Sequence, residues 1–350
     1  MPRTRVLPVV AALLTLALGS GQHAQAGDLT PEIIMDRIGL TAAQKAEVEQ
    51  GQIISSGFEE LSDKELALTV VAMIPAPIEK VLDFARAARV LEVNREVLAF
   101  RVLVEGEDRR KALAEAVLTG AETAEIAKLL QVKPGSDFNL SPAEMQRFAN
   151  LRKRFPGKGC ERDPACSKAV LSEYLDVLAG RLEAYQEYGL SGIEPYARGG
   201  SKTADPAEEL EAAGKSLKLF ARHLPEVCDA FIEYPKGDQS ILKHDFAWIK
   251  QNIQDRPTFL LSHMMLYEGE ELAFSAERQF FVGQSYNSLQ IIFGLFSADD
   301  STLVFYLNRT STDQVAGFMS GTRHTVGRKF MDKEVRRQVE AILTHFRDAP

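Results

Sequence analysis

Hydrophobic residues follow two periods along the chain, and the changes between them divide it into parts. In residues 66–74 every second side chain is apolar, which is typical of a β-strand with one buried face. Pro75 and Pro77 end this strand, and apolar residues in 78–85 then recur at the spacing of an amphipathic helix. Residues 95–106 predict a second strand.

The middle of the chain, residues 107–240, has almost entirely helical signals. Residues 141–144 (SPAE) and 205–208 (DPAE) each place an N-cap residue, a proline in the first turn and an acid at the third helical position. Asp163 caps a further helix that runs to about residue 188. The stretch 189–206 is rich in glycine and turn-forming residues, and we interpret it as a loop of about eighteen residues, functional or simply mobile.

From Asp245 the period returns to two. Strands are expected at 245–254, 258–268, 271–282, 286–297 and 301–312. A helix closes the chain, with one apolar face formed by Phe330, Val335, Val339, Ile342 and Phe346. The pattern predicts an α+β fold with an antiparallel meander.

The stretch "LALTVVAMIPAPIEKVLDFAR" predicts a strand and a helix, and the chain closes with a meander followed by a long helix. This order of elements resembles the helix-grip fold of the START-like superfamily, whose opening strand and helix are similar to the quoted stretch. It implies a curved sheet that grips the C-terminal helix and encloses a cavity for a small apolar ligand. The departure is the helical segment of over a hundred residues, and an unrelated α+β fold with the same element order remains an alternative.

On this interpretation the chain has five parts. They are a signal peptide (1–26), an N-terminal helical segment (27–58), the opening strand–helix unit of the helix-grip-like domain (59–106), a helical insertion (107–240), and the meander with its helix (241–350).

Arg278 is a charged residue at one of the alternating positions that are otherwise apolar. The even-numbered residues of 272–282 are otherwise apolar, so Arg278 is expected to point into the core. A turn centred on Gly283 and Gln284 pairs Arg278 with Leu289, and the next turn pairs Leu289 with Arg309. The same register pairs Phe274 with Phe293 and Phe293 with Phe305, and Gln290 points outward.

Two arginines on a core face require partners, because an unpaired buried charge costs several kcal/mol. Guanidinium groups bind carboxylates and phosphates through two hydrogen bonds. The predicted ligand-binding residues are Arg278, Arg309, Asn287, Phe274, Phe280, Phe293 and Phe305. The alternative is that this row lies at the solvent-facing end of the sheet or pairs with an acid such as Asp313 or one from the helical insertion.

The first residues have the features of a secretory signal peptide. Two arginines precede an apolar run of about 14 residues, shorter than the roughly 20 that span a membrane, and Ala24-Gln25-Ala26 precedes the expected cleavage site. We expect cleavage near Ala26, a periplasmic location and no membrane-spanning segment afterwards. An uncut anchor is the alternative.

The net charge, the cysteines and the missing motifs restrict the classes of partner and cofactor that the chain could bind. Loss of Arg3 and Arg5 takes the formal charge from −8 to about −10, which argues against nucleic acid. Cys160 and Cys166 are expected to form a disulfide in an oxidising compartment, and Cys228 is interpreted as a buried thiol. The histidines lack the spacing of a helical metal site, so no metal is expected, and without a glycine-rich phosphate loop no nucleotide cofactor is implied.

Three functional hypotheses remain. The first is a carrier or sensor for an amphiphilic, anionic ligand such as a lipid or fatty acid, in a helix-grip cavity. The second is an enzyme on this scaffold, of hydrolase, cyclase or isomerase type, that uses His324, Asp313 or His263. The third is an envelope interaction protein in which the helical insertion fills the grip and no cavity remains.

Overall fold

The computed structural model describes residues 29–86, 96–114, 123–156, 160, 163–317 and 320–348. The signal peptide expected at residues 1–26 lies outside these ranges. Within them, no helix combines the length and the apolar composition that a membrane crossing needs.

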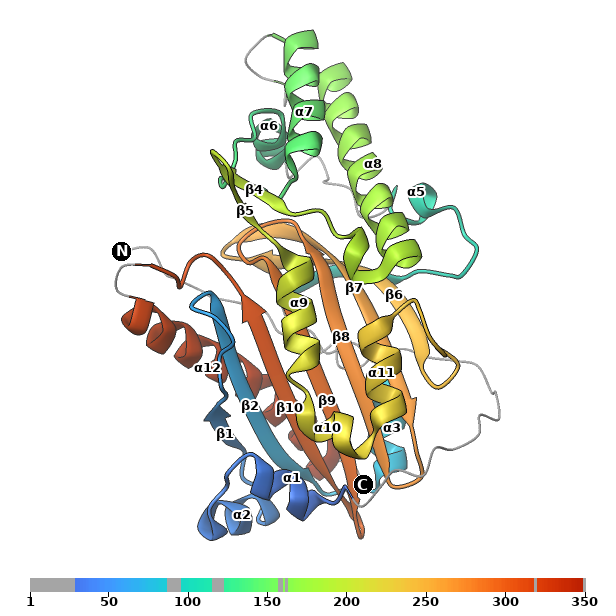
Figure 1. Cartoon of the computed structure of the whole chain (residues 1–350), viewed down its shortest axis with the longest axis vertical. Coiled ribbons are helices and arrows are strands. Elements are labelled where there is room, and N and C mark those ends of the chain that lie inside the picture. Colours follow the sequence, from blue (N-terminus) through green and yellow to red (C-terminus); the bar gives the residue numbers. More distant parts are fainter. Residues whose placement is uncertain are drawn as a thin grey trace.

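An antiparallel sheet of eight strands forms the centre of the molecule, in the order β1-β2-β10-β9-β8-β7-β6-β3 (Figure 1). The strands are β1 Ile54–Gly57, β2 Glu65–Ile74, β3 Val97–Val102, β6 Lys243–Ile253, β7 Arg256–Glu268, β8 Leu272–Val282, β9 Ser288–Ala298 and β10 Ser301–Ser311. The five strands predicted after Asp245 are therefore confirmed to within a few residues, as is the opening strand.

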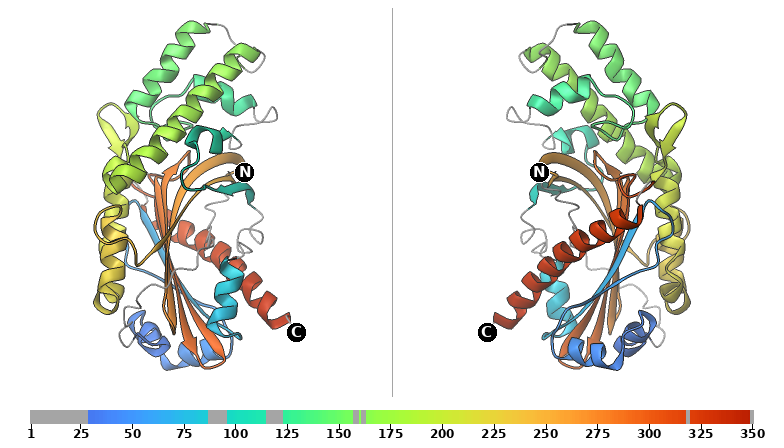
Figure 2. Two further views of the ribbon diagram at one scale, coloured as in Figure 1. Left: turned by 90° about the vertical axis from the view of Figure 1, so that its right-hand side faces the viewer. Right: turned by 90° about the vertical axis from the view of Figure 1, so that its left-hand side faces the viewer.

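Helices cover both faces of this sheet. The helices of the described residues are α1 Pro31–Arg37, α2 Ala42–Glu49, α3 Ile78–Arg86, α5 Arg109–Ala112, α6 Thr123–Leu130, α7 Pro142–Arg154, α8 Pro164–Tyr188, α9 Pro206–Lys215, α10 Lys218–His223, α11 Pro225–Glu233 and α12 Ser320–Asp348. Helices α9 to α11 lie on one face and α3 and α12 on the other (Figure 2). Because both faces are covered, the central strands are apolar on both sides.

The predicted C-terminal helix is α12, which packs on β2. Met331, Val335 and Leu343 are buried against the sheet. Gly327 allows the close approach, because a Cβ at that position would lie 2.7 Å from Cδ1 of Leu66. The fold is thus a mixed α+β fold with a large antiparallel sheet and a C-terminal helix.

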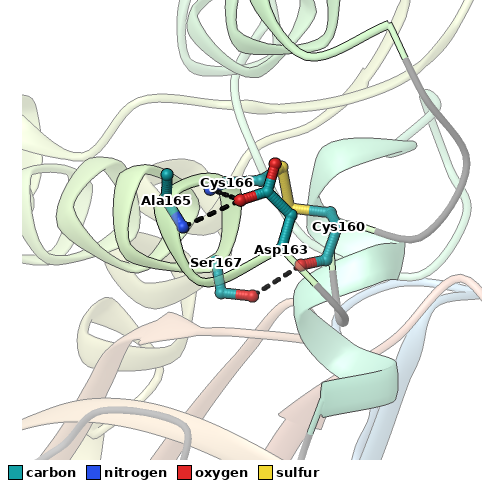
Figure 3. The surroundings of a disulfide bond; sticks show 5 residues. All are labelled: Cys160, Asp163, Ala165, Cys166 and Ser167. Atoms are coloured by element: carbon teal, nitrogen blue, oxygen red, sulfur yellow. Dashed lines mark hydrogen bonds between the residues drawn. A yellow bond between two sulfur atoms is a disulfide. The ribbon is translucent and has the colours of Figure 1, made fainter.

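Helices α7 and α8 form an arm that extends beyond one end of the sheet (Figure 1). The expected disulfide between Cys160 and Cys166 is present at the start of α8 (Figure 3). Asp163 caps the helix, its Oδ1 accepting from the backbone N–H groups of Ala165 at 2.9 Å and Cys166 at 3.3 Å. The hydroxyl of Ser167 donates to the carbonyl of Cys160 at 2.6 Å, so the cap and the disulfide hold one turn together.

The stretch 189–206 is not the irregular loop that we predicted. It contains a 3₁₀ turn, Gly189–Gly192, and a two-stranded hairpin of β4, Tyr196–Gly199, and β5, Lys202–Ala204. Gly199 and Gly200 have φ values of 93° and 59°. Such values strain residues with a Cβ, so the two glycines that indicated a loop in fact form a tight hairpin turn.

The register of the meander differs by one residue from our prediction. Arg278 pairs with Gln290, and Phe274 with Gly294. The turn between β8 and β9 is centred on Gln284 instead of between Gly283 and Gln284, with Ser285 at φ 76°. The apolar pattern could not reveal this shift because β9 is apolar on both faces.

Candidate ligand-binding site

Arg278 lies on the sheet face that α9 and α11 cover. Its exposed fraction is 0%. The carbon of its guanidinium lies 4.0 Å from the centre of the Phe231 ring on α11. On its other side, α9 comes close at Gly214, where a Cβ would lie 3.6 Å from Nη2. The inward orientation expected from the strand period is therefore observed, under a helical layer.

Arg278, Gln290 and Arg309 occupy one row across three neighbouring strands. The predicted row contained Leu289 instead of Gln290. The register is shifted by one residue at β8–β9 and again at β9–β10, so the two arginines still fall in one row. Strands are spaced about 4.8 Å apart, so the two arginine backbones lie about 10 Å from each other.

Several polar atoms of this row are buried without a hydrogen-bond partner among the described residues. They are Nε2 and Oε1 of Gln290, Nε of Arg309, and the guanidinium nitrogens of Arg278, which form no hydrogen bond of standard geometry although the neutral hydroxyl of Tyr185 lies beside them. In the described part of the chain no carboxylate forms an ion pair with Arg278. A buried guanidinium without a carboxylate partner is unfavourable by several kcal/mol. The donors of this row could therefore bind an anion.

Arg309 already has a partner. Its Nη1 donates to Oε2 of Glu65 at 2.7 Å and to the carbonyl oxygen of Glu59 at 3.1 Å. Burial raises the pKa of Glu65, and the charge of Arg309 opposes that rise. The partner of Arg309 is thus an acid, as in our alternative, but Glu65 lies outside the predicted helical insertion, and Asp313 pairs with Arg198 at 2.6 Å instead.

A pocket of about 520 Å³ opens beside Arg309, between β10, the end of α1 and helices α9 and α10. Its lining residues are Arg37, Ile38, Phe58, Glu59, Leu61, Ala212, Lys215, Ser216, Leu217, Lys218, Leu219, Phe220, Arg222, Phe305, Leu307 and Arg309. Buried Phe220, Phe305 and Leu307 form an apolar floor. This is the size of a small-molecule site.

The charges of this pocket are mainly positive. Arg37, Lys215, Lys218 and Arg222 are exposed and form a basic rim. Glu59 is the one acid among the lining residues that the structure describes. The pocket therefore combines apolar surface with an excess of cations, in a chain whose formal charge is −8.

Two of the seven predicted ligand-binding residues, Phe305 and Arg309, line this pocket. Phe274 lies behind its floor, with its ring centre 5.0 Å from that of Phe220. Phe293 belongs to the opposite face, in the core under α12, because of the register shift.

The other two predicted residues lie farther along the sheet, and each has structural partners. The ring of Phe280 stacks on Tyr185 of α8 with centres 3.9 Å apart. Asn287 accepts from Nη2 of Arg198 and donates to Oε1 of Glu209, both at 2.8 Å. Asn287 thus links the β4–β5 hairpin to α9. Their binding roles, like those of the other five, stay predictions.

A hydrogen-bonded chain runs towards Arg278 from the edge of the helical layer. His244 Nε2 lies 3.4 Å from the carbonyl oxygen of Gln239, and His244 Nδ1 lies 3.0 Å from Nε2 of His263. His263 Nδ1 lies 3.0 Å from the hydroxyl of Tyr185. Assigned from these partners, the protons run in one direction: Tyr185 donates to His263, His263 to His244 and His244 to the carbonyl.

Both histidines of this chain favour the neutral state. Burial lowers the pKa of His244, and burial together with the charges of His244 and Arg278 lowers the pKa of His263 well below its usual value. Burial raises the pKa of Tyr185, and Arg278 opposes that rise. Arg278 therefore remains the charged group of this cluster.

The two other residues proposed for catalysis also have structural partners. Nδ1 of His324 lies 2.7 Å from Oε2 of Glu60 and its Nε2 lies 2.9 Å from the carbonyl oxygen of Asp63, which fixes the start of α12 to the β1–β2 connection. Asp313 accepts from Arg198 and Lys64, which lower its pKa against the effect of burial. Neither residue, nor His263, is among the lining of the 520 Å³ pocket.

A smaller pocket lies on the face that a helix-grip cavity would occupy. It has a volume of about 230 Å³ and lies between the start of α12 and the sheet, with Leu66, Tyr286 and Val326 in its lining. The larger pocket is on the opposite face.

The sequence analysis did not predict the basic rim or the buried position of Gln290. The rim residues come from α1, α9 and α10, which only the folded chain brings together. Gln290 was expected to face solvent and is 1% exposed. A usable signal was present on α10, where Lys218 and Arg222 are spaced by four residues and so share a helix face.

No protein-family model and no curated protein matches the chain. Among solved structures, the chain is similar to a START superfamily protein from Mycobacterium smegmatis, with 13% identity and a TM-score of 0.22. The match covers 29% of this chain and spans 64% of the length of that protein. It agrees with the partial START-like resemblance seen in the sequence.

Proposed function

We propose that the protein is a periplasmic binding protein for an amphiphilic, anionic ligand of the lipid or fatty-acid type. The observation that carries this proposal is the pocket beside β10, whose floor is apolar and whose rim is basic. Volumes of about 300–1,000 Å³ are typical of sites for small molecules, so the pocket has room for one apolar chain.

The floor suits an extended hydrocarbon. Phe305, Leu307 and Arg309 alternate along β10 and therefore face the same side of the sheet, over a length of about 14 Å. Phe220 packs against Phe305 with ring centres 5.6 Å apart, which makes the apolar end aromatic. A ligand lying along the strand would have its tail near Phe305 and a polar end near Arg309.

The positive charges of the rim attract an anion to the pocket. Exposed lysine and arginine side chains attract anions at long range, although salt screens this effect. Arg309 is 3% exposed, so it acts in a less polar environment where a charge–charge interaction is stronger.

Two further parts of the proposal concern the location and the fold. The periplasmic location is supported by the signal-peptide features of residues 1–26. The helix-grip interpretation is supported by the antiparallel meander and by α12 across one face of the sheet. The proposed pocket lies on the other face, under the helical layer that ordinary helix-grip proteins lack.

The first test is native mass spectrometry of the protein purified from a periplasm, followed by organic extraction. A co-purifying fatty acid or other single-chain lipid is the expected result. Ala212→Trp places a large side chain into the mouth of the pocket from an exposed position on α9, and should abolish this retention. Ala221→Trp, also exposed but outside the lining, is the matched control and should retain the ligand.

A clean apo mass for the wild-type chain, together with unchanged thermal stability across a panel of lipids and fatty acids, would overturn the proposal. So would equal ligand retention by the Ala212→Trp and Ala221→Trp variants, because the ligand would then lie elsewhere.

A further inference from the structure

The row formed by Arg278, Gln290 and Arg309 has hydrogen-bonding groups that the protein itself does not use. Arg278 and Gln290 are 0% and 1% exposed. The side-chain amide of Gln290 lacks a hydrogen-bond partner in the described ranges, and the guanidinium of Arg278 interacts there with the neutral hydroxyl of Tyr185 but with no carboxylate. Arg309 belongs to this row and also lines the pocket. It is therefore the point where the pocket meets the row.

Only one helical turn separates Arg278 from the pocket. Ala212, Lys215 and Ser216, at the end of α9, line the pocket. Gly214, in the same turn, faces the guanidinium of Arg278. The charge of Arg278 thus lies directly behind the pocket wall and is not balanced by an ion pair with a described carboxylate.

We propose that the oxyanion of the ligand binds at the Arg309 end of the pocket, next to Gln290, with Arg278 as the residue that selects for negative charge. This inference rests on the proposed function and adds the orientation of the ligand: the head group lies against the row and the tail lies along Leu307 and Phe305. The rim cations guide the ligand to the pocket but do not hold its head.

Solvent exposure distinguishes the row from the rim. Charges on exposed side chains are screened by water and salt, whereas a charge enclosed by protein is screened much less. Arg309 is already neutralised by Glu65. Arg278 is not neutralised by any described acid, so it contributes a net positive charge that a carboxylate or phosphate ester would compensate.

The test compares two probes that differ only in the head group, dodecanoic acid and dodecanol. Their affinities are measured for the purified protein by competition with a fluorescent fatty-acid analogue. Arg278→Met keeps an unbranched apolar side chain at this position and removes the charge. It should weaken dodecanoate binding about tenfold or more and leave dodecanol binding unchanged.

Two further variants complete the design. Gln290→Leu removes the neighbouring amide and should weaken dodecanoate binding in the same selective manner, which keeps the test available if Arg278→Met does not fold. The double variant Lys218→Gln/Arg222→Gln alters only the exposed rim. It should retain the preference for dodecanoate and lose part of the salt dependence of association.

The outcomes separate this inference from the proposed function. If the wild type binds neither probe, both fail. If it binds dodecanoate but the preference over dodecanol disappears in the rim variant and survives in Arg278→Met and Gln290→Leu, the head group lies at the rim and this inference is wrong, while the binding function stands.

Discussion

Arg181 and Glu144 form a buried ion pair through two hydrogen bonds. Nε of Arg181 donates to Oε1 of Glu144 at 2.7 Å, and Nη2 donates to Oε2 at 2.6 Å. Glu144 also accepts from the backbone of Ser141, and the guanidinium carbon lies 4.9 Å from the centre of the Phe281 ring on β8. One arginine of α8 therefore joins the N-terminus of α7 to the sheet.

Removing one member of this pair should be strongly destabilising. Arg181→Met leaves the carboxylate of Glu144 buried without its partner, which typically costs roughly 3–5 kcal/mol. Urea unfolding monitored by circular dichroism measures the loss. The double variant Arg181→Met/Glu144→Met should recover most of the stability, and failure to recover would mean that the packing of the arginine, not the ion pair, is what matters.

The paired histidines predict a loss of stability in acid. The pKa values of His244 and His263 are lowered in the folded protein. Each group therefore binds fewer protons when folded than when unfolded, so its contribution is fully present above about pH 6.5 and is lost as the pH falls through its lowered folded value. The raised pKa values of Asp245, at about 6, and of Glu209 act in the opposite direction.

A substitution separates these opposing effects. His244→Asn places an amide near the position of Nδ1, next to His263, and removes one titrating group. We expect the variant to lose less stability than the wild type between pH 7 and pH 5, as measured by chemical unfolding at each pH. A steeper loss in the variant would contradict this account.

The three cysteines should differ in reactivity. Cys160 and Cys166 form the disulfide, and Cys228 is 0% exposed with a pKa that burial raises to about 12. A thiol reagent should label no cysteine in the native protein, one after unfolding and all three after unfolding with reduction. Rapid labelling of the native protein would mean that Cys228 is accessible.

Loss of the disulfide should have a moderate effect. Its two cysteines are separated by 6 residues, and so short a loop corresponds to about 2 kcal/mol in the chain-entropy model. Cys160→Ser/Cys166→Ser should lower the free energy of unfolding by this amount without changing the fold.

Elements with one simple pattern could be predicted from the sequence. The capping pattern of Ser141 and Glu144 marks α7 as observed, and Glu144 Oε2 accepts from the Ser141 backbone at 2.7 Å. The five strands of the meander follow from the hydrophobic period of two that begins at Asp245. The position of Arg278 followed from the period of β8.

The register and the pocket could not be obtained this way. Ile291 and Phe293 face α12 while Ile292 and Phe296 face the other helical layer, so β9 has no polar face to indicate its phase. Phe280 adds a bulge in β8, where Leu261 pairs with Phe281 and Ser262 with Gln279. The pocket depends on how α1, α9 and α10 lie on β10, which no local pattern specifies.

Arg278 and Arg181 should respond differently to the same substitution. Arg181 has a carboxylate partner and Arg278 has none in the described part of the chain, so Arg278→Met removes a buried charge without leaving another unpaired. The contact of the guanidinium with Phe231 is lost, which costs about 0.5–2 kcal/mol, but the cost of burying the charge disappears as well. We expect the ligand-free Arg278→Met variant to be as stable as the wild type or more stable.

Thermal and urea unfolding of the delipidated wild type, Arg278→Met and Arg181→Met measure this difference. A loss for Arg278→Met as large as that for Arg181→Met would mean that the protein itself satisfies Arg278, and the reason to expect an anion at this row would be gone.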